Sequence, residues 1–423
     1  MMYKEQLNTP VAGEYDVIVA GAGPAGVTAA IAAGRAGMKT LLLDQCGCLG
    51  GMWTSGLVNP LFDFRRKQGI IREIVDTLAE KSQFGGFGNS CFQYEYMKCL
   101  LDDMVKDAGV DVLLNTFVAR AIAEEGTVRG VVTENKDGRR AYFSEVVIDC
   151  TGDADIAESA GAECLVGRAG DGAVQAITLM FTIGNVHYKQ NDCNQLYNLF
   201  LDAMAKTGAH YDCPYERPYI IQIPNSNTAA VQLTHVRGAD VLSAKALSDA
   251  LSEGRRQAIM AVEFMKANIP EFKDIELLQT APLMGVRESR RIVGEYTLTA
   301  EDLIAGKQFE DGLFDALFNM DVHEPDSRGQ NCTHLTKPYQ VPYRCLIPKH
   351  IKNLLVAGRC ISGTHEAMAS YRVTGSCSAM GEAAGYAAAE AVRQNKDLRL
   401  VSVEEIKKNQ KRYDKHLDNP KFV

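Results

Sequence analysis

Three glycines and one carboxylate near the start of the chain have the types and the spacing to bind a dinucleotide. Gly21, Gly23 and Gly26 follow the apolar run 17–20, and Asp44 ends a second apolar run. Gly21 permits a tight turn, Gly23 lets backbone amides approach a pyrophosphate, and Gly26 lets a helix lie close to the strand. An acid about 20 residues past the glycines accepts hydrogen bonds from ribose hydroxyls and disfavours NADP, because it repels a 2′-phosphate. We therefore predict an adenine dinucleotide at this turn.

The residues around the glycines predict the elements that position them. A buried strand over 17–20, a helix after the turn and a second strand ending at Asp44 form one Rossmann-type unit. The helix directs its unpaired N–H groups and the positive end of its dipole at the phosphates. Small residues at Ala30, Ala33 and Gly37 keep the inner face of this helix thin. All of these parts fall in register, which is far more specific than a glycine pattern alone.

Length and composition indicate a globular protein with more than one domain. The chain has 423 residues, of which 46% are hydrophobic, so it can bury a large core. Its 45 basic and 53 acidic side chains give a formal charge of −8, and no long basic run suits a nucleic acid. We therefore expect a small-molecule substrate and no nucleic-acid partner.

The start of the chain and its cysteines bear on compartment and metal binding. The first residues contain no apolar signal region, and no run approaches the roughly 18 apolar residues of a membrane helix. These features predict a soluble, unexported, cytoplasmic protein without a membrane span. The 12 cysteines indicate reduced thiols, and the one close pair, Cys46 and Cys48, lacks the partners of a zinc site. We expect no metal, and a redox role for that pair stays open.

The rest of the chain predicts an inserted domain and then a return to the first one. Helices are expected at 69–82 and 94–108, followed by a β-meander and a buried parallel strand. The meander and the parallel strand cover residues 112–114, 117–122, 128–134, 140–143 and 146–148. Later strands at 176–183, 219–223 and 229–233 are combined with helices near 191–206 and 242–267. A buried strand at 354–357 and a small-residue helix at 376–392 complete the first domain.

These patterns predict an α/β fold, in which a Rossmann-like domain with a β-meander is joined to a second, α+β substrate domain. We expect the Rossmann-like domain to be discontinuous, formed by residues 1–163 and 341–423. Residues 164–340 are expected to form the substrate or cap domain. The sequence contains no second dinucleotide fingerprint and no internal repeat.

Five segments together resemble one family. They are GAGPAG with its Asp44, LGGMWTSGLVNP at 49–60, DCTGDADIAESAGAE at 149–163, GVRESRRIVGEYTLTAEDLIAGKQF at 285–309 and the stretch 353–389. In this combination the chain resembles the FAD-dependent oxidoreductases of the glutathione-reductase-like flavoprotein superfamily, the two-dinucleotide-binding-domain type. The resemblance spans nearly the whole chain. It implies that the dinucleotide is FAD and that the Rossmann-like domain is an FAD-binding domain.

The resemblance also implies which residues contact FAD. The segment 50–54 runs along the pyrophosphate and ribityl chain, the backbone of Val118 touches adenine, and the segment 151–153 passes beside the dinucleotide. Arg359, where many relatives carry an acid, pairs with the pyrophosphate. The expected FAD-binding residues are Gly21, Ala22, Gly23, Pro24, Ala25, Gly26, Asp44, Gln45, Gly50, Gly51, Met52, Thr54, Val118, Thr151, Gly152, Asp153, Gly358, Arg359, Gly375, Ser376 and Cys377.

The final helix admits two interpretations. Gly381, Gly385 and Ala388 form a smooth face for close packing, and the N-terminus near 375–377 directs its dipole at whatever lies beyond. If that is the flavin pyrimidine ring, the dipole stabilises the anionic edge of reduced flavin and raises its potential. The alternative is a small-residue helix packed for structural reasons alone.

Three side chains are candidates for catalysis, since a flavin supplies the hydride chemistry and the protein must supply a clamp and an acid or base. His365 lies in a loop expected to face the ring, where it exchanges a proton with the substrate or else hydrogen-bonds the loop. Arg287 is the preferred clamp for a carboxylate or phosphate, whereas its charged neighbours in 288–291 are expected mostly in structural ion pairs. His323 is a second acid or base kept protonated by neighbouring carboxylates, or else a solvated turn residue.

The sequence therefore predicts an FAD-dependent oxidoreductase that transfers hydride between a small polar organic substrate and flavin N5. Dehydrogenation of a hydroxyl or amine and reduction of an activated double bond are the expected reaction types. Because the chain has no internal NAD domain, it requires an external electron donor or acceptor. A flavin monooxygenase and a non-catalytic electron-transfer scaffold are the alternatives. The substrate, the reaction direction, the oligomeric state and any covalent flavin link stay open.

Overall fold

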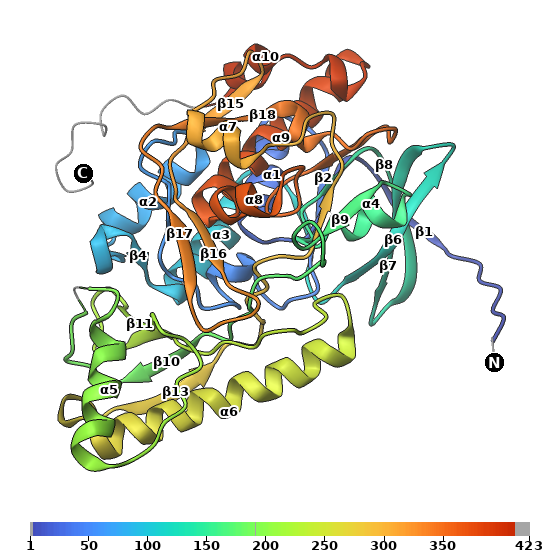
Figure 1. Cartoon of the computed structure of the whole chain (residues 1–423). Helices are drawn as coiled ribbons and strands as arrows, with labels where there is room; N and C mark the ends of the chain where they lie inside the picture. Colours follow the sequence, from blue (N-terminus) through green and yellow to red (C-terminus); the bar gives the residue numbers. More distant parts are fainter. Residues whose placement is uncertain (1–2, 191, 411–423) are drawn as a thin grey trace.

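A seven-stranded sheet lies at the centre of the larger part of the molecule (Figure 1). The computed structural model describes residues 3–190 and 192–410. The strand order is β5-β2-β1-β8-β7-β6, and β19 pairs with β8 on the same side as β7. These strands are β1 (Val11–Ala20), β2 (Thr40–Leu43), β5 (Asp111–Leu113), β6 (Phe117–Glu124), β7 (Thr127–Asn135), β8 (Gly138–Asp149) and β19 (Leu354–Val356).

The Rossmann-type core of this sheet is parallel and buried. Strands β5, β2, β1, β8 and β19 run parallel, whereas β6 and β7 join antiparallel to β8 as a meander. The last four residues of β1 and all four residues of β2 are buried. Continuous apolar runs are typical of strands covered on both faces, which is why these runs could be recognised in the sequence.

The structure corrects one boundary in the meander. The prediction of separate strands at 140–143 and 146–148 is wrong, because β8 is a single strand from Gly138 to Asp149. Its first half pairs with β7 and its second half with β19, while β1 pairs along its length. The polar residues Ser144 and Glu145 interrupt the apolar run in the sequence. Their backbone is nevertheless extended, and they belong to β8 between the part that pairs with β7 and the part that pairs with β19.

Seven helices belong to the part of the described structure around the main sheet. They are α1 (Pro24–Arg35), α2 (Ile70–Glu80), α3 (Tyr94–Asp107), α4 (Asp155–Ser159), α8 (His365–Tyr371), α9 (Thr374–Gln394) and α10 (Val403–Asn409). Of these, α1 and α9 pack on strands β1 and β8 of the sheet. The long helix α9 packs tightly on α1: a Cβ on Gly381 would collide with the carbonyl oxygen of Ala25, and one on Gly385 with that of Ala29. The predicted close packing of this small-residue face is therefore confirmed.

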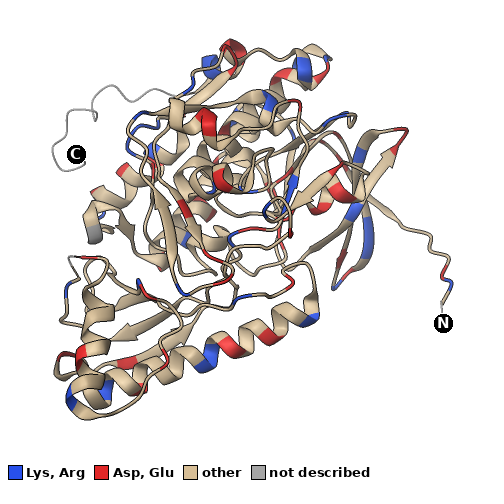
Figure 2. Ribbon diagram, in the orientation of Figure 1, with Lys and Arg blue, Asp and Glu red and all other residues tan. Residues whose placement is uncertain are grey.

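A second sheet with its own core lies below the first in Figure 1. Its order is β11-β12-β10-β13, and every pairing is antiparallel. Its elements are β10 (Phe181–Gly184), β11 (Tyr219–Gln222), β12 (Ala229–Gln232), β13 (Glu276–Thr280), α5 (Gln195–Thr207) and α6 (Ala244–Asn268). Acidic and basic side chains are interspersed along α6 (Figure 2).

The described residues also form short two-stranded sheets. They are β3 (Phe84–Gly85) with β4 (Cys91–Phe92), β9 (Cys164–Val166) with β14 (Arg290–Ile292), β15 (Gly312–Ala316) with β18 (Tyr339–Pro342), and β16 (Met320–His323) with β17 (Gln330–Thr333). With α7 (Ala300–Ala305), several of them contribute to the larger core, which also contains Leu298, Leu313 and Tyr339. The boundaries at 163/164 and 340/341 stay a prediction.

The predicted α/β class with a Rossmann-like sheet and meander is confirmed. Within the described residues, no helix combines the length and the apolar character needed to cross a membrane. The same part of the chain contains no cluster of three or more His, Cys, Asp or Glu side chains arranged to hold a metal ion.

Candidate functional site

A cavity of about 460 Å³ extends from the glycine turn after β1 to the second sheet. Most of the residues expected to bind the dinucleotide line it: Gly21, Gly23, Pro24, Ala25, Asp44, Gln45, Gly51, Met52, Val118, Thr151, Gly152, Asp153, Gly358, Arg359 and Cys377. The opposite wall includes Met180, which precedes β10, Ile221 of β11 and Leu251 of α6. Distant parts of the chain therefore converge on one space.

The remaining expected residues lie just outside the cavity and shape its wall. A Cβ on Gly26 would collide with the carbonyl oxygen of Gly21, so this glycine permits the close approach of α1. The amide of Gly50 donates to Ala22 (2.8 Å), and the Thr54 hydroxyl donates to Leu49 (2.5 Å). Ser376 donates to Asp63 (2.7 Å), and a Cβ on its neighbour Gly375 would collide with Phe62. These residues support the loops that line the cavity.

The glycine turn is held by the carboxylate that the sequence singled out. Gly21 has a φ of +93°, and Asp44 accepts hydrogen bonds from the amides of Ala22 (2.5 Å) and Cys46 (2.6 Å). Gly51 fits closely against the same turn, because a Cβ there would come within 2.8 Å of the Cα of Gly23. Asp44 thus ties together the ends of β1 and β2 while it lines the cavity.

Five polar side chains gather at the part of the cavity nearer β16, and we call them the His–Arg cluster. They are His235, Arg287, Asp321, His323 and Arg372, and all except His235 line the cavity. The Arg287 Nη1 donates to the carbonyl oxygen of Ala176 (2.6 Å) and to the hydroxyl of Thr178 (2.8 Å). Arg372 donates to the carbonyl oxygen of Asp321 (2.9 Å).

The two histidines of the cluster form a chain of hydrogen bonds with a defined polarity. His235 Nδ1 lies 2.7 Å from the carbonyl oxygen of Thr234, which only accepts, so Nδ1 carries the proton. In the neutral ring, His235 Nε2 then accepts from His323 Nδ1, 3.0 Å away. This leaves His323 Nε2 as the proton-accepting atom, 3.4 Å from an Asp321 carboxylate oxygen. The ring of Tyr215 stacks on His235 with centroids 4.0 Å apart.

The electrostatics of the cluster keep His323 neutral near pH 7. Burial and the Arg287 cation lower the pKa of His323 to about 4, although Asp321 acts in the opposite direction. Burial and Arg287 likewise lower the pKa of His235 well below its usual value. Neighbouring carboxylates were expected to keep His323 protonated, and this expectation is wrong because desolvation and a nearby cation outweigh them. His323 is also not a solvated turn residue, since it ends strand β16 and is buried.

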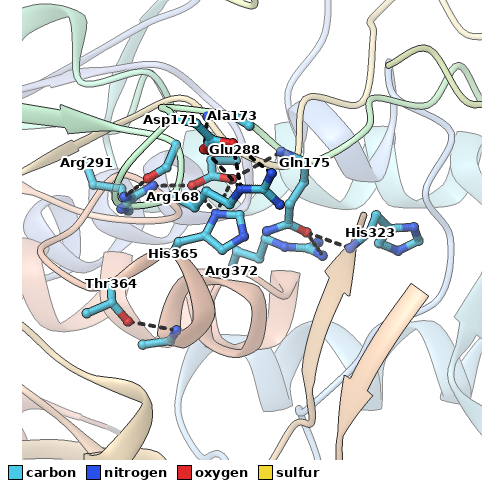
Figure 3. A network of polar contacts seen from close by, with 12 residues as sticks. Arg168, Asp171, Ala173, Gln175, Glu288, Arg291, His323, Thr364, His365 and Arg372 are labelled. Carbon is cyan, nitrogen blue, oxygen red and sulfur yellow. Dashed lines mark hydrogen bonds and ion pairs between the residues drawn. The ribbon is translucent and has the colours of Figure 1, made fainter. Parts of the chain in front are cut away.

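His365 lies outside the cavity lining, on the far side of a buried polar network that reaches His323 through Gln175 (Figure 3). Its Nδ1 is 2.8 Å from Glu288, a fully buried carboxylate that also pairs with Arg291. Gln175 connects this network to the cluster, because its Oε1 accepts from the amide of His323 (3.1 Å). The structure therefore brings Arg287 and His323 together and does not place His365 beside them.

In the charged segment 287–291, the neighbours of Arg287 form structural ion pairs, as the sequence indicated. Arg290 pairs with Asp155 (2.9 Å), and Arg291 pairs with Glu288. Among the described residues, Arg287 forms no ion pair within 4.0 Å, and it faces the cavity. The structural role of the neighbours and the distinct position of Arg287 both follow from these contacts.

Sequence reasoning missed His235, Asp321 and Arg372. Asp321 was noticed only as a neighbour of His323, and no local spacing marked the other two. Asp321 and His323 sit at i and i+2 in β16, which places both side chains on one face of a strand. That spacing was the one signal that a search for an acid–base pair had available.

Comparisons with known proteins identify the family of this chain. Residues 16–410 match the family described as FAD dependent oxidoreductase. The chain belongs to that family. It is therefore an enzyme, an oxidoreductase, and its cofactor is FAD.

Relatives with assigned names match only part of the chain of this FAD-dependent oxidoreductase. Digeranylgeranylglycerophospholipid reductase 2 of Methanopyrus kandleri is 32% identical over 161 residues, which are 35% of this chain and 40% of the reductase. Thiamine thiazole synthase of Methanococcus aeolicus is 32% identical over 154 residues, which are 34% of this chain and 57% of the synthase. The matches thus span about half of the length of these relatives.

A solved structure shows the same fold over nearly the whole oxidoreductase. The flavin-dependent brominase Bmp2 has a TM-score of 0.51 and 14% identity, and the match covers 92% of this chain and 81% of the brominase. The myxobacterial chondrochloren halogenase CndH gives a TM-score of 0.50 at 12% identity, over 94% of this chain and 78% of the halogenase. At this identity the likeness concerns the fold alone.

The residues of this oxidoreductase fit FAD. Arg359 Nε and the Thr374 hydroxyl are buried donors without a hydrogen-bond partner among the described residues, and both side chains line the cavity. FAD offers many acceptor oxygens to such donors. Thr374 and Cys377, in the first turn of α9, also line the cavity, so the positive end of this helix dipole faces it. The remaining donors of Arg359 bind Asp153 and the carbonyl oxygen of Val286 (2.7 Å).

Proposed function

We propose that this enzyme is a dehydrogenase or reductase in which a small polar organic substrate exchanges a hydride with the flavin and a proton with His323. The observation that carries the proposal is the place of His323. It lines the same cavity as the dinucleotide-binding glycines, and its ring is held between His235 and Asp321. A relative named as a reductase supports the same class of reaction.

When bound, FAD supplies the hydride acceptor or donor at N5. His323 supplies the proton chemistry: in dehydrogenation its neutral Nε2 accepts the proton of a substrate hydroxyl or amine, and in reduction it returns one. Asp321 stabilises the imidazolium that forms. Arg287 binds a polar group of the substrate, and an external donor or acceptor renews the flavin. We further propose that the chain belongs to the glutathione-reductase-like superfamily, on the strength of the five sequence segments.

Anaerobic titration of the purified holoenzyme tests this proposal. Hydroxy acids, sugars and amines are added while the flavin band at ~450 nm is followed, and a substrate is expected to bleach it. His323→Ala should slow the bleaching by roughly 10²-fold or more, the usual range for a lost acid or base. His334→Ala is the matched control, because this histidine is exposed and lies outside the cavity lining.

The outcomes separate the alternatives. Equal bleaching rates in wild type and His323→Ala, both with FAD bound, would contradict the role of His323. Flavin reduction only by a nicotinamide, followed by transfer of oxygen to the product, would replace the proposal by a monooxygenase. Flavin that is reduced only by a partner protein, with no turnover of small molecules, would support the electron-transfer scaffold.

A further inference from the structure

We propose that the substrate of this enzyme is an organic oxyanion, such as a carboxylate, whose charged group binds Arg287 and whose apolar part lies against the second sheet. The inference rests on the proposed function, because it assigns the substrate class for the same cavity. Three observations carry it: the charge balance of the His–Arg cluster, the free donors of Arg287 and the composition of the facing wall.

The charges of the cluster do not balance. Arg287 and Arg372 are two cations, and Asp321 is the one carboxylate among them. That carboxylate faces His323 at 3.4 Å and Arg372 at 4.0 Å. The neighbouring carboxylates already have cationic partners. Glu288 pairs with Arg291, Asp153 with Arg359, and Asp155 with Arg290. One positive charge of the His–Arg cluster therefore has no carboxylate partner, and an uncompensated cation beside a cavity favours an anionic ligand.

The electrostatic state of neighbouring groups agrees with this excess of positive charge. Burial and the Arg372 cation lower the pKa of Arg287 itself to about 10, so the group stays charged at pH 7. Both histidines of the cluster also have depressed pKa values, to which Arg287 contributes. The titratable groups that face His323 are Arg287, Arg372, Asp321, neutral His235 and the phenol of Tyr215. A bound anion would oppose the effect of the two cations.

Arg287 has donors left for such a ligand. Within the described structure, only its Nη1 forms hydrogen bonds, to Ala176 and Thr178, which fix the guanidinium plane. Nε and Nη2 form none with any described residue, and the side chain lines the cavity. A guanidinium with a fixed plane and free donors suits the two oxygens of a carboxylate.

The wall that faces these donors is mainly apolar. The lining residues are Met180, which precedes β10, Ile221 of β11, Leu247 and Leu251 of α6, and Leu283 and Met284 in the segment before Arg287. Met180 and Ile221 are buried, and Leu247 and Leu251 are partly buried against the core. A ligand with an apolar body beside a charged head matches a lining of this kind. The hydroxyls of a sugar, in contrast, would find no polar partners on this wall.

Matched ligands that differ only in charge test the inference. Hexanoate and hexanamide are titrated into the FAD-loaded enzyme at constant ionic strength and pH 7, and binding is followed by the perturbation of the flavin spectrum. Because hydrogen bonds to charged groups contribute about 1.5–3 kcal/mol, hexanoate should bind at least roughly tenfold more tightly than hexanamide. Arg287→Met should reduce this ratio to about one, and Arg287→Lys should retain part of it.

Arg256→Met is the control variant, because this arginine is an exposed residue of α6 and lies outside the cavity lining. It should keep the wild-type ratio of the two affinities. Equal affinity of wild type for the acid and the amide, or an unchanged ratio in Arg287→Met, would overturn the inference. Loss of FAD from Arg287→Met would do the same, since Arg287 would then serve the cofactor.

The same experiment separates this inference from the proposed function. If Arg287-dependent preference for hexanoate is found while no hydroxy acid or related anion bleaches the flavin, the hydride-transfer proposal fails and the anion site stands. If a neutral alcohol or amine bleaches the flavin at a rate that Arg287→Met leaves unchanged, the hydride-transfer proposal stands and the anion site fails.

Discussion

Two substitutions that flank His323 should move its titration in opposite directions. Burial and Arg287 lower the pKa of His323 from 6.5 to about 4, and Asp321 partly counteracts them. Burial is the largest cause and Arg287 the next, and the contribution of a nearby charge of this kind is on the order of one pKa unit, or ~1.4 kcal/mol. Arg287→Met should therefore raise the pKa to about 5. Asp321→Asn should lower it below 4, because the imidazolium loses its carboxylate.

The assay is the pH dependence of anaerobic flavin bleaching by a substrate. A neutral His323 is required to accept the proton, so the rate should rise with pH through the pKa of this group. The midpoint of this rise in the pH–rate profile, its rising limb, should lie near pH 4 in wild type, near pH 5 in Arg287→Met and at lower pH in Asp321→Asn. Arg256→Met should leave the limb in place. Limbs that shift in the same direction in both variants, or in neither, would refute the electrostatic argument.

Two further substitutions test other parts of the structure. Buried Glu382 has a pKa raised from 4.5 to about 7 by desolvation, so its contribution to stability is full below pH 4.5 and is lost as pH rises through 7. Glu382→Gln should remove about 3 kcal/mol of that pH dependence, measured by denaturant unfolding at about pH 4 and pH 8. Gly51→Ala should weaken FAD binding, because its Cβ would approach the Cα of Gly23 to 2.8 Å, and FAD retained after gel filtration reports the loss. Gly208→Ala has a similar positive φ without a neighbouring atom within 4 Å and should retain FAD.

The dinucleotide-binding part of the fold could be predicted because its determinants are local. The turn at Gly21, the helix after it and the acid at Asp44 follow from the steric needs of one short stretch. The strand β8 shows the limit of such reasoning. Ser144 and Glu145 break the apolar pattern, but pairing with β1, a partner more than 120 residues distant in sequence, keeps the backbone extended.

The catalytic candidates show a second limit. His365 was placed by its position in a loop, yet the orientation of a side chain depends on its partner, and the buried carboxylate of Glu288 holds His365 away from the cavity. His235 and Arg372 enter the cluster from segments that share no spacing with His323. Charge balance is a property of the assembled site, and for this reason the sequence indicated Arg287 as a ligand without showing that its charge is uncompensated.

The uncompensated charge of Arg287 links substrate binding to proton transfer. In the free enzyme this cation lowers the pKa of His323, and a bound oxyanion would cancel much of that effect. His323 should then be a stronger base in the complex than in the free enzyme. The profile of kcat/KM reports the free enzyme, whereas that of kcat reports the complex. The rising limb of kcat should therefore lie about one pH unit above that of kcat/KM for an anionic substrate. In Arg287→Met the two limbs should lie closer together, because the variant lacks the cation that binds the anion beside His323 and only Arg372 still lowers its pKa. A wild-type enzyme whose limbs coincide with an anionic substrate would show that Arg287 and His323 act independently.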